Sequence, residues 1–278
     1  MPETLVDPAS ETATEDSGPV VIFENVSITF EREPVLKDIS FSVDRGETLI
    51  ILGPAGTGKS VLMKLVNGLL RPDSGTVTVF GEKVSAMRER DLFKLRHRIG
   101  MVFQESALFD SLSVEDNVAY RLHEEGVPQE EAHRRTEEVL NFVELPTAIS
   151  KFPSELSGGM RRRVSIARAI ITGPDLILYD SPTGGLDPIT STTIIELVVK
   201  QRDVSHTTSL LITHRLQDAF TLATHRFSQE TGKMELIPDG GIEDSTQFLV
   251  LNEGSIVFHG STKELTNSED PWIKEYLA

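Results

Sequence analysis

The sequence contains no cysteine, which excludes disulfide bonds, thiolate metal sites and a cysteine nucleophile. It has no apolar run near the ~20 residues that a membrane-spanning helix needs, and no basic-then-apolar leader, so we expect a cytosolic chain. Basic residues are scarce, because 27 Lys and Arg stand against 43 Asp and Glu, for a net charge of −16. This balance argues against a general nucleic-acid binder, which usually has a basic surface.

The remaining composition is that of an ordinary globular protein. A chain of 278 residues with 38% hydrophobic and 25% charged residues suits one large α/β domain, alone or with a small subdomain. Residues 1–19 differ, because they are rich in Glu, Thr, Ser, Pro and Asp and contain no Lys or Arg. We predict a disordered acidic tail there and a folded domain over residues 20–278.

The most informative stretch is a glycine-rich segment between a predicted strand and a predicted helix. Residues 49–52 are apolar, residues 61–70 have helical character, and between them lies G-x-x-x-x-G-K-S. Glycines let backbone N–H groups converge on phosphate oxygens, Lys59 can reach the β- and γ-phosphates, and the Ser60 hydroxyl can bind Mg²⁺. A plain turn is the alternative, but the flanking elements favour a nucleotide-binding loop. Its residues are Gly53, Pro54, Ala55, Gly56, Thr57, Gly58, Lys59 and Ser60.

The chain alternates between strand-rich and helix-rich blocks. Strands are predicted over residues 20–30 and 38–44, and a hairpin over residues 75–84 with its turn at 80–83. Residues 106–154 form a helix-rich block, with Ser113 as a helix cap and Pro128 as a first helical residue. Strand and helix alternation then resumes. The end of the chain predicts a small hairpin with its turn at 252–254, then an amphipathic helix around residues 272–277.

Three further patterns could complete a phosphate site. The apolar run 176–179 ends in Asp180, as a Mg²⁺-binding acid requires, although many strands end in Asp. Ser157 precedes two glycines at a helix start, which is a second phosphate-binding surface. We expect the arginines 161–163 beside it to lie on helix faces and pair with acids. His214 follows the apolar run 210–212 and could touch the γ-phosphate, although a lone histidine there is more often structural.

Together these segments resemble the nucleotide-binding subunits of ABC transporters. The resemblance covers roughly residue 20 to the end of the chain, and the order of the motifs is specific. It implies an α/β P-loop ABC-type domain with an antiparallel β subdomain and a helical subdomain near residues 105–155. The matching segments are residues 53–60 (Walker A), Gln104 in V-F-Q-E (Q-loop), 156–160 (signature), 176–180 (Walker B), 185–187 (D-loop) and His214 (switch histidine), with Phe30 where an aromatic usually stacks on adenine.

The resemblance also implies how the subunit works. Gln104 would sense the metal and the γ-phosphate, and couple them to the helical block. Ser157, Gly158 and Gly159 would act across a head-to-tail homodimer, or pseudo-dimer, that closes on two ATP molecules. Closure would drive a separate transmembrane permease through a groove near Gln104. The implied magnesium ligands are Ser60, Gln104 and Asp180.

Finer features are similar to the Mla/Mkl-type ATPases of bacterial lipid transport. These features are residues 103–112, 114–119 and 158–164, and the ending 268–272. That group works with a permease and an MCE-type lipid-binding protein to move phospholipids or sterols. The resemblance therefore implies a peripheral subunit at the cytoplasmic face of the inner or plasma membrane. Amino-acid and metal importers share most of the same motifs, so an importer of another substrate is the alternative.

Two departures from the family pattern matter for function. The position after Asp180 usually holds Glu, which polarises the attacking water, and here it is Ser181. Three interpretations stay open: slow turnover carried by Gln104 and His214, substitution by another acid such as Glu105, or a weak or inactive regulatory subunit that binds ATP. Gly184 also stands where relatives often have another residue. Residues 225–248 extend a usually short connection, and predict a surface hairpin or loop rather than a partner contact.

Overall fold

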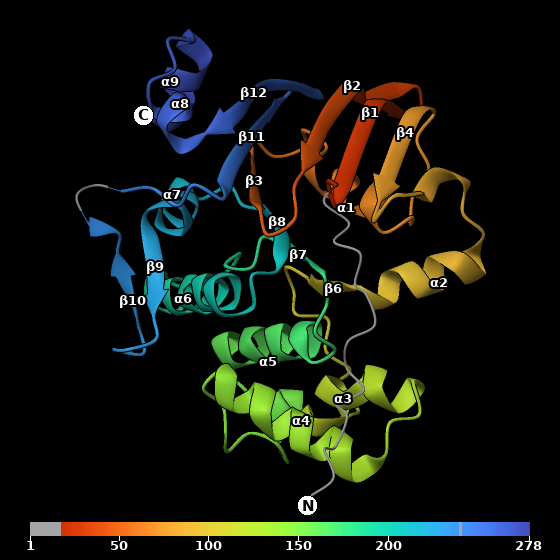
Figure 1. Ribbon diagram of the computed structural model, residues 1–278, viewed down its shortest axis with the longest axis vertical. Helices are drawn as coiled ribbons and strands as arrows, with labels where there is room; N and C mark the ends of the chain where they lie inside the picture. The colour runs from red at the N-terminus through yellow and green to blue at the C-terminus, as the bar shows by residue number, and fades with distance from the viewer. Residues whose placement is uncertain (1–17, 239–240) are drawn as a thin grey trace, which may run out of the picture.

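The computed structural model describes residues 18–238 and 241–278 (Figure 1). Most of the predicted acidic tail, residues 1–17, lies outside the described residues. None of the helices in the described ranges is both long and apolar enough to cross a bilayer.

A six-stranded sheet forms the centre of the fold. Its strand order is β12-β11-β3-β8-β7-β6, and every neighbouring pair is parallel except β12 with β11. β3 and β8 are buried along their whole length, as expected for parallel strands covered on both faces. The strands are β3 (Thr48–Leu52), β6 (Ile99–Val102), β7 (Leu176–Asp180), β8 (Thr208–Ile212), β11 (Thr246–Asn252) and β12 (Ser255–Ser261).

A second, antiparallel sheet carries the beginning of the described chain. Its order is β2-β1-β4-β5, and the stacked rings of Phe23 and Phe41, 4.6 Å apart, lie in its core. The predicted strands and hairpin are present, but the turn is shorter than predicted, because Glu82 and Lys83 pair with β4. The strands are β1 (Val21–Phe30), β2 (Glu33–Val43), β4 (Ser74–Val79) and β5 (Glu82–Lys83).

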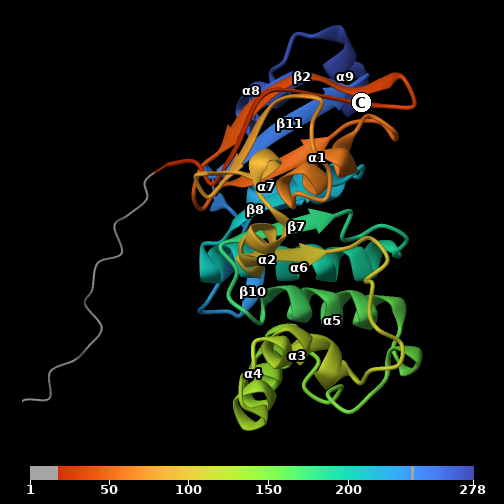
Figure 2. The same ribbon diagram turned by 90° about the vertical axis from the view of Figure 1, so that its right-hand side faces the viewer.

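Helices α3, α4 and α5 form a layered block at one end of the molecule, and α8 and α9 lie at the other end (Figure 1). In Figures 1 and 2, α5 lies between the sheet and the pair α3 and α4. Two predicted bounds were wrong. α1 ends at Val66, where Asn67 and then Gly68, with φ of +64°, end the helix, and Pro128 precedes α4 as its cap. The helices are α1 (Lys59–Val66), α2 (Glu89–His97), α3 (Val114–Glu124), α4 (Gln129–Phe142), α5 (Gly158–Ile170), α6 (Pro188–Ser205), α7 (Leu216–Thr224), α8 (Thr262–Thr266) and α9 (Pro271–Leu277).

The predicted surface hairpin exists and packs on α6. β9 (His225–Ser228) and β10 (Lys233–Leu236) pair antiparallel. The Phe227 N–H donates to Asp203 on α6 at 2.6 Å, and the Lys200 ammonium lies 5.5 Å from the Phe227 ring centre. β11 begins at Thr246, inside the approximate range predicted for the extension. The predicted last hairpin, with its turn at 252–254, is present as β11 and β12, and β11 also pairs with β3 inside the central sheet.

One buried amide organises the start of the helical block. Asn117 on α3 is fully buried, and its Nδ2 donates to the carbonyls of Phe109, Leu112 and Ser113 at 2.9–3.1 Å. Its Oδ1 accepts from the Phe109 N–H at 2.8 Å. One side chain therefore satisfies the backbone of the loop that leads into α3, beside the predicted cap Ser113, whose Oγ accepts from the Asp116 N–H at 3.0 Å.

Replacing this amide by an apolar side chain of similar size will destabilise the chain. We expect Asn117→Leu to lower the free energy of unfolding by about 2 kcal/mol, because buried backbone groups lose their partners. Denaturant unfolding of the full chain measures the change. The exposed Asn141 provides the control, and Asn141→Ala should stay within about 0.5 kcal/mol of the native chain. Equal effects of the two substitutions would contradict this role of Asn117.

Candidate nucleotide-binding site

The phosphate loop lies between the carboxyl end of β3 and the start of α1, and two of its glycines have no room for a side chain. Gly53 has φ of +140°, and an added Cβ would lie 2.2 Å from the Leu251 carbonyl oxygen. Gly58 has φ of +94°, and its added Cβ would lie 2.6 Å from Leu36. Glycine is therefore required here by backbone conformation and by close packing together.

Lys59 folds back over the loop. Its ammonium donates to the carbonyl oxygens of Gly53 and Pro54 at 2.7 and 2.6 Å, and Thr57 Oγ1 donates to the Pro54 oxygen at 3.0 Å. Burial lowers the pKa of Lys59, and the negative charge of Asp180 partly offsets this. A cation held by neutral carbonyls gains by exchanging them for phosphate oxygens, since charge-assisted hydrogen bonds are the stronger ones.

A cavity of about 530 Å³ opens beside this loop and unites segments that are far apart in the sequence. Nine of the predicted site residues line it. Gly53, Pro54 and Thr57 are not part of this lining, and Pro54 and Thr57 line a neighbouring cavity instead. Phe30 is not part of the lining, where Val35 from β2 is found instead, and the predicted surface at 157–159 lies outside it. The lining residues are Val35, Ala55, Gly56, Gly58, Lys59, Ser60, Val61, Gln104, Asp180, Ser181, Ile212 and His214.

The oxygen donors of this cavity suit a magnesium ion that is bound together with phosphates. Mg²⁺ is usually held by one or two carboxylates, waters and substrate phosphates rather than by a protein cage. Ser60, Gln104 and Asp180 supply a hydroxyl, an amide and a carboxylate on the same cavity wall. No group of three or more His, Asp and Glu that could hold a metal occurs within residues 18–238 and 241–278. When bound, the ion would neutralise charge that develops on the phosphates.

Ser181 is nearly buried, with 7% of its surface exposed, in a turn with φ of +48°. Its N–H donates to the Ile212 carbonyl and its own carbonyl accepts from the Gly184 N–H, both at 2.9 Å. Among the described lining residues, Asp180 is the one carboxylate, and Glu105 is not part of the wall. The described lining therefore offers no acid at the place of the family's usual Glu, and the Ser181 hydroxyl cannot act as a base at neutral pH.

Arg162 connects the Gln104 loop to the segment after Ser181. It is 3% exposed, and its guanidinium donates to the carbonyls of Phe103, Gln104 and Gly184. The prediction that the three arginines pair with acids was therefore largely wrong, because Arg162 and Arg161 donate to backbone carbonyls. Arg163 does pair with Glu144 at 3.1 Å. Nothing in the sequence distinguished Arg162 from its neighbours.

A second connection joins the Ser181 turn to the segment that carries His214. Thr183 Oγ1 donates to the buried carboxylate of Asp218 on α7, and Arg215 lies 3.8 Å from the other oxygen of Asp218. Burial raises the pKa of Asp218, while the bond from Thr183 and the nearby positive charges lower it. No local pattern predicted this contact, because Thr183 and Asp218 belong to different elements at the sheet edge.

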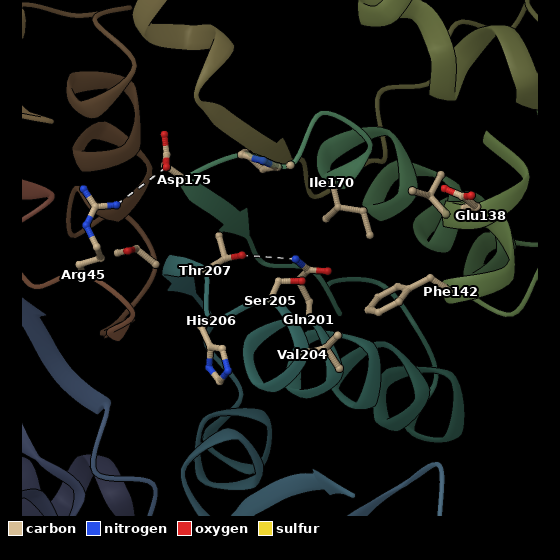
Figure 3. Close-up of a pocket in the computed structure, with 14 residues that line it drawn as sticks. Arg45, Glu138, Phe142, Ile170, Asp175, Gln201, Val204, Ser205, His206 and Thr207 are labelled. Atoms are coloured by element: carbon tan, nitrogen blue, oxygen red, sulfur yellow. Dashed lines mark hydrogen bonds and ion pairs between the residues drawn. The ribbon is translucent and has the colours of Figure 1, made fainter. Parts of the chain in front are cut away.

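A larger cavity, of about 570 Å³, lies at the opposite edge of the sheet, where β7 and β8 begin (Figure 3). Arg45 and Asp175 form an ion pair at 3.8 Å on one side of it, and Gln201 donates to Thr207 at 3.4 Å in its middle. Its described lining contains no glycine-rich loop like that of residues 53–60. Ligands of open α/β sheets bind outside the carboxyl ends of the strands, so the smaller cavity is the candidate nucleotide site.

The fold and this site define a P-loop nucleotide-binding domain, with an antiparallel sheet and a helical block added to the central sheet. The sequence profile described as ABC transporter matches residues 36–184. The chain belongs to the ABC transporter family, and is an ATP-binding subunit of that family.

Its relatives differ in what their names say they transport. The chain is 34% identical to the intermembrane phospholipid transport system ATP-binding protein MlaF of Escherichia coli K12, over 93% of this chain and 88% of that protein. It is 38% identical to a methionine import ATP-binding protein, MetN 2, of Bacillus cereus ZK / E33L, over 81% of this chain and 67% of that protein.

Solved structures of ABC cassettes match the fold. A dimeric post-hydrolysis structure of the ATP-binding cassette MJ0796, bound to ADP and Pi, has a TM-score of 0.73 and 28% identity, over 87% of this chain and 98% of that one. The structure of cbiO1 from Clostridium perfringens, part of the ABC transporter complex cbiONQ, has a TM-score of 0.73 and 27% identity, over 90% of this chain and 92% of that one. These matches confirm the predicted fold class.

Proposed function

We propose that this subunit couples ATP binding and slow ATP hydrolysis to lipid transport by a separate permease. One observation carries the proposal. Lys59, Gln104, Asp180 and His214 come from four distant segments and line one cavity beside a phosphate loop. A cation for the phosphates, oxygen donors for a metal and a group that can sense the γ-phosphate are what ATP-driven coupling requires.

The predicted second phosphate surface, formed by Ser157, Gly158 and Gly159, would bind the nucleotide of a partner subunit. Ser157 caps α5, with its Oγ accepting from the Met160 N–H at 3.2 Å, and Gly158, the first residue of the helix, is exposed. This surface lies outside the cavity of its own chain. A head-to-tail pair would bring the three residues Ser157, Gly158 and Gly159 against the nucleotide of the other copy. The dimeric form of the cassette MJ0796 supports a pair of this kind.

A groove next to the Gln104 loop fits the permease. A cavity of about 330 Å³ lies between β6, the following loop and helices α3 and α5. Phe103 and Phe109 in its wall are 39% and 46% exposed. Exposed aromatic side chains around a hollow are typical of protein interfaces. Arg162 donates to the carbonyls of Phe103 and Gln104, so a shift of Gln104 on nucleotide binding would also move Phe103 in the wall of the groove.

Two observations support lipid as the substrate class. The chain matches nearly the whole length of MlaF, and the segments 103–112, 114–119, 158–164 and 268–272 are similar to the Mla/Mkl-type ATPases. The chain spans 88% of MlaF of E. coli, named for phospholipid transport, but 67% of the methionine importer subunit, which is therefore longer. We infer that an MCE-type lipid-binding protein completes the assembly at the membrane. Import of methionine or another small solute is the competing function.

The groove can be tested by placing a charge in it. We expect Phe109→Glu to weaken binding to the permease by at least about tenfold, because an unpaired charge in an apolar interface is costly. Affinity purification of the tagged chain with its permease measures this, and ATP binding by the free chain should stay unchanged. Phe93→Glu is the matched control, because Phe93 is exposed on α2 and does not line the groove. Equal loss of permease with the two substitutions would contradict the proposed groove.

The same purified complex tests the substrate. Reconstituted in liposomes with its permease and MCE-type partner, it should transfer fluorescent phospholipid between vesicles when ATP is present. The Lys59→Ala complex is the control, because its phosphate loop lacks the cation for the nucleotide. Methionine uptake without lipid transfer would contradict the proposed substrate class.

Ser181 keeps a second function open, that of a subunit that binds ATP and closes with hardly any hydrolysis. We expect turnover of the native complex to exceed that of Lys59→Ala, and Ser181→Glu to raise it at least about tenfold, since a general base contributes about 10²–10⁴-fold. Steady-state phosphate release by the reconstituted complex measures all three. If turnover of the native complex equals that of Lys59→Ala, and Ser181→Glu raises it, the proposal of slow hydrolysis is contradicted. The subunit then binds ATP and closes without hydrolysing it.

A further inference from the structure

The C-terminal helix touches the first residue of the phosphate loop. The hydroxyl of Tyr276 on α9 accepts a hydrogen bond from the Gly53 N–H at 3.0 Å, across 223 residues of sequence. We propose that Tyr276 is a positioning residue through which α9 holds the start of the phosphate loop and raises its affinity for nucleotide. The proposal rests on the nucleotide-binding role of this loop.

The position of the Tyr276 hydroxyl is fixed by the packing of α9. Asp270 caps the helix, with Oδ1 accepting from the N–H groups of Trp272 and Ile273 at 2.8 and 3.1 Å. Ile273 is 1% exposed and belongs to the same core cluster as Phe248 of β11. The ring of Trp272 stacks on that of Tyr276, 5.2 Å between centres. The Tyr276 side chain is already ordered by this packing, so its hydroxyl binds the Gly53 N–H without a further loss of conformational entropy.

Gly53 is held from three directions. Tyr276 takes its N–H, the Leu251 carbonyl oxygen fills the space beside its Cα, and Lys59 donates to its carbonyl at 2.7 Å. The last of these contacts competes with nucleotide, because phosphate oxygens attract the same ammonium more strongly than a carbonyl does. The bond to Tyr276 does not involve Lys59 and can persist while the ammonium turns to the phosphates.

The chemistry of the phenol suits this role. Burial raises the pKa of Tyr276, and the bond from the Gly53 N–H partly offsets the change, so the group stays a neutral acceptor near pH 7. A loop that is preorganised before binding loses less freedom when the phosphates arrive. The affinity for nucleotide should therefore fall when the oxygen of Tyr276 is removed, even if the helix remains folded.

The test is equilibrium binding of a fluorescent ATP analogue with Mg²⁺ to the full-length chain. Tyr276→Phe keeps the ring and removes only the oxygen. We expect its Kd to rise about two- to tenfold, the range that one neutral hydrogen bond spans. Hydrogen exchange of the nucleotide-free chain should be faster at the end of β3 in this variant. The unfolding temperature should fall by only a few degrees, because the buried Gly53 N–H loses its partner, and binding is measured well below that transition.

Ile273→Val is the matched control on the same helix. It shortens a buried side chain and leaves the hydroxyl, so it should lower the unfolding temperature and leave Kd within about twofold of native. If α9 has only a structural role, both variants should weaken nucleotide binding in proportion to their loss of stability.

Three results separate the possibilities. Native affinity and native exchange in Tyr276→Phe would overturn the proposal, and so would equal weakening by Ile273→Val. Lys59→Ala provides the reference for lost phosphate binding. If the native chain binds nucleotide no better than Lys59→Ala, the nucleotide-binding role of the loop fails. If the native chain binds nucleotide well and Tyr276→Phe has the same Kd, only the role of Tyr276 fails.

Discussion

The carbonyl oxygen of Leu251 lies where a side chain of residue 53 would begin, and much of the site depends on this close approach. It requires glycine at the end of β3 and brings β11, from near the end of the chain, against the phosphate loop. The loop is thereby shaped by distant parts of the sequence as well as by its own glycines. Lys59, Gln104, Asp180 and His214 line one cavity beside this loop.

Buried polar contacts join the loop to the rest of the molecule. Arg162 ties the Gln104 loop to Gly184, and Thr183 ties the same turn to Asp218 on α7. An added Cβ at Gly184 would lie 3.1 Å from Gln104, so these segments are also packed tightly. Interactions of this kind have few alternative arrangements, because a broken bond leaves a buried group unpaired. In the proposed function, these contacts transmit the effect of nucleotide binding to the groove near Phe109.

Local patterns in the sequence predicted the phosphate loop and offered Asp180 and His214 as candidates, whose roles were implied only by the family resemblance. Each follows an apolar run, and the carboxyl ends of parallel strands meet at one edge of a sheet. The place of β11 in that sheet, Val35 in the cavity wall and the contacts of Arg162 could not be predicted. They depend on packing between segments far apart in the chain, and an arginine in a helix has the same local pattern whether it meets an acid or a carbonyl. Ser181 was recognised as a departure, and its environment contains no substitute acid among the described lining residues.

The central claim is that Ser157, Gly158 and Gly159 complete the nucleotide site of a second copy. Sedimentation of the chain with Mg²⁺ and a slowly hydrolysed ATP analogue tests it most directly, beside Gly158→Glu. A side chain at residue 158 has room within its own chain, since its Cβ would lie 3.6 Å from Leu186, but a carboxylate there would face the phosphates of the partner. We expect nucleotide to double the mass of the native 30.7 kDa chain, and Gly158→Glu to bind nucleotide and stay a monomer. A native chain that binds nucleotide and remains monomeric, or a Gly158→Glu variant that dimerises like native, would contradict the claim.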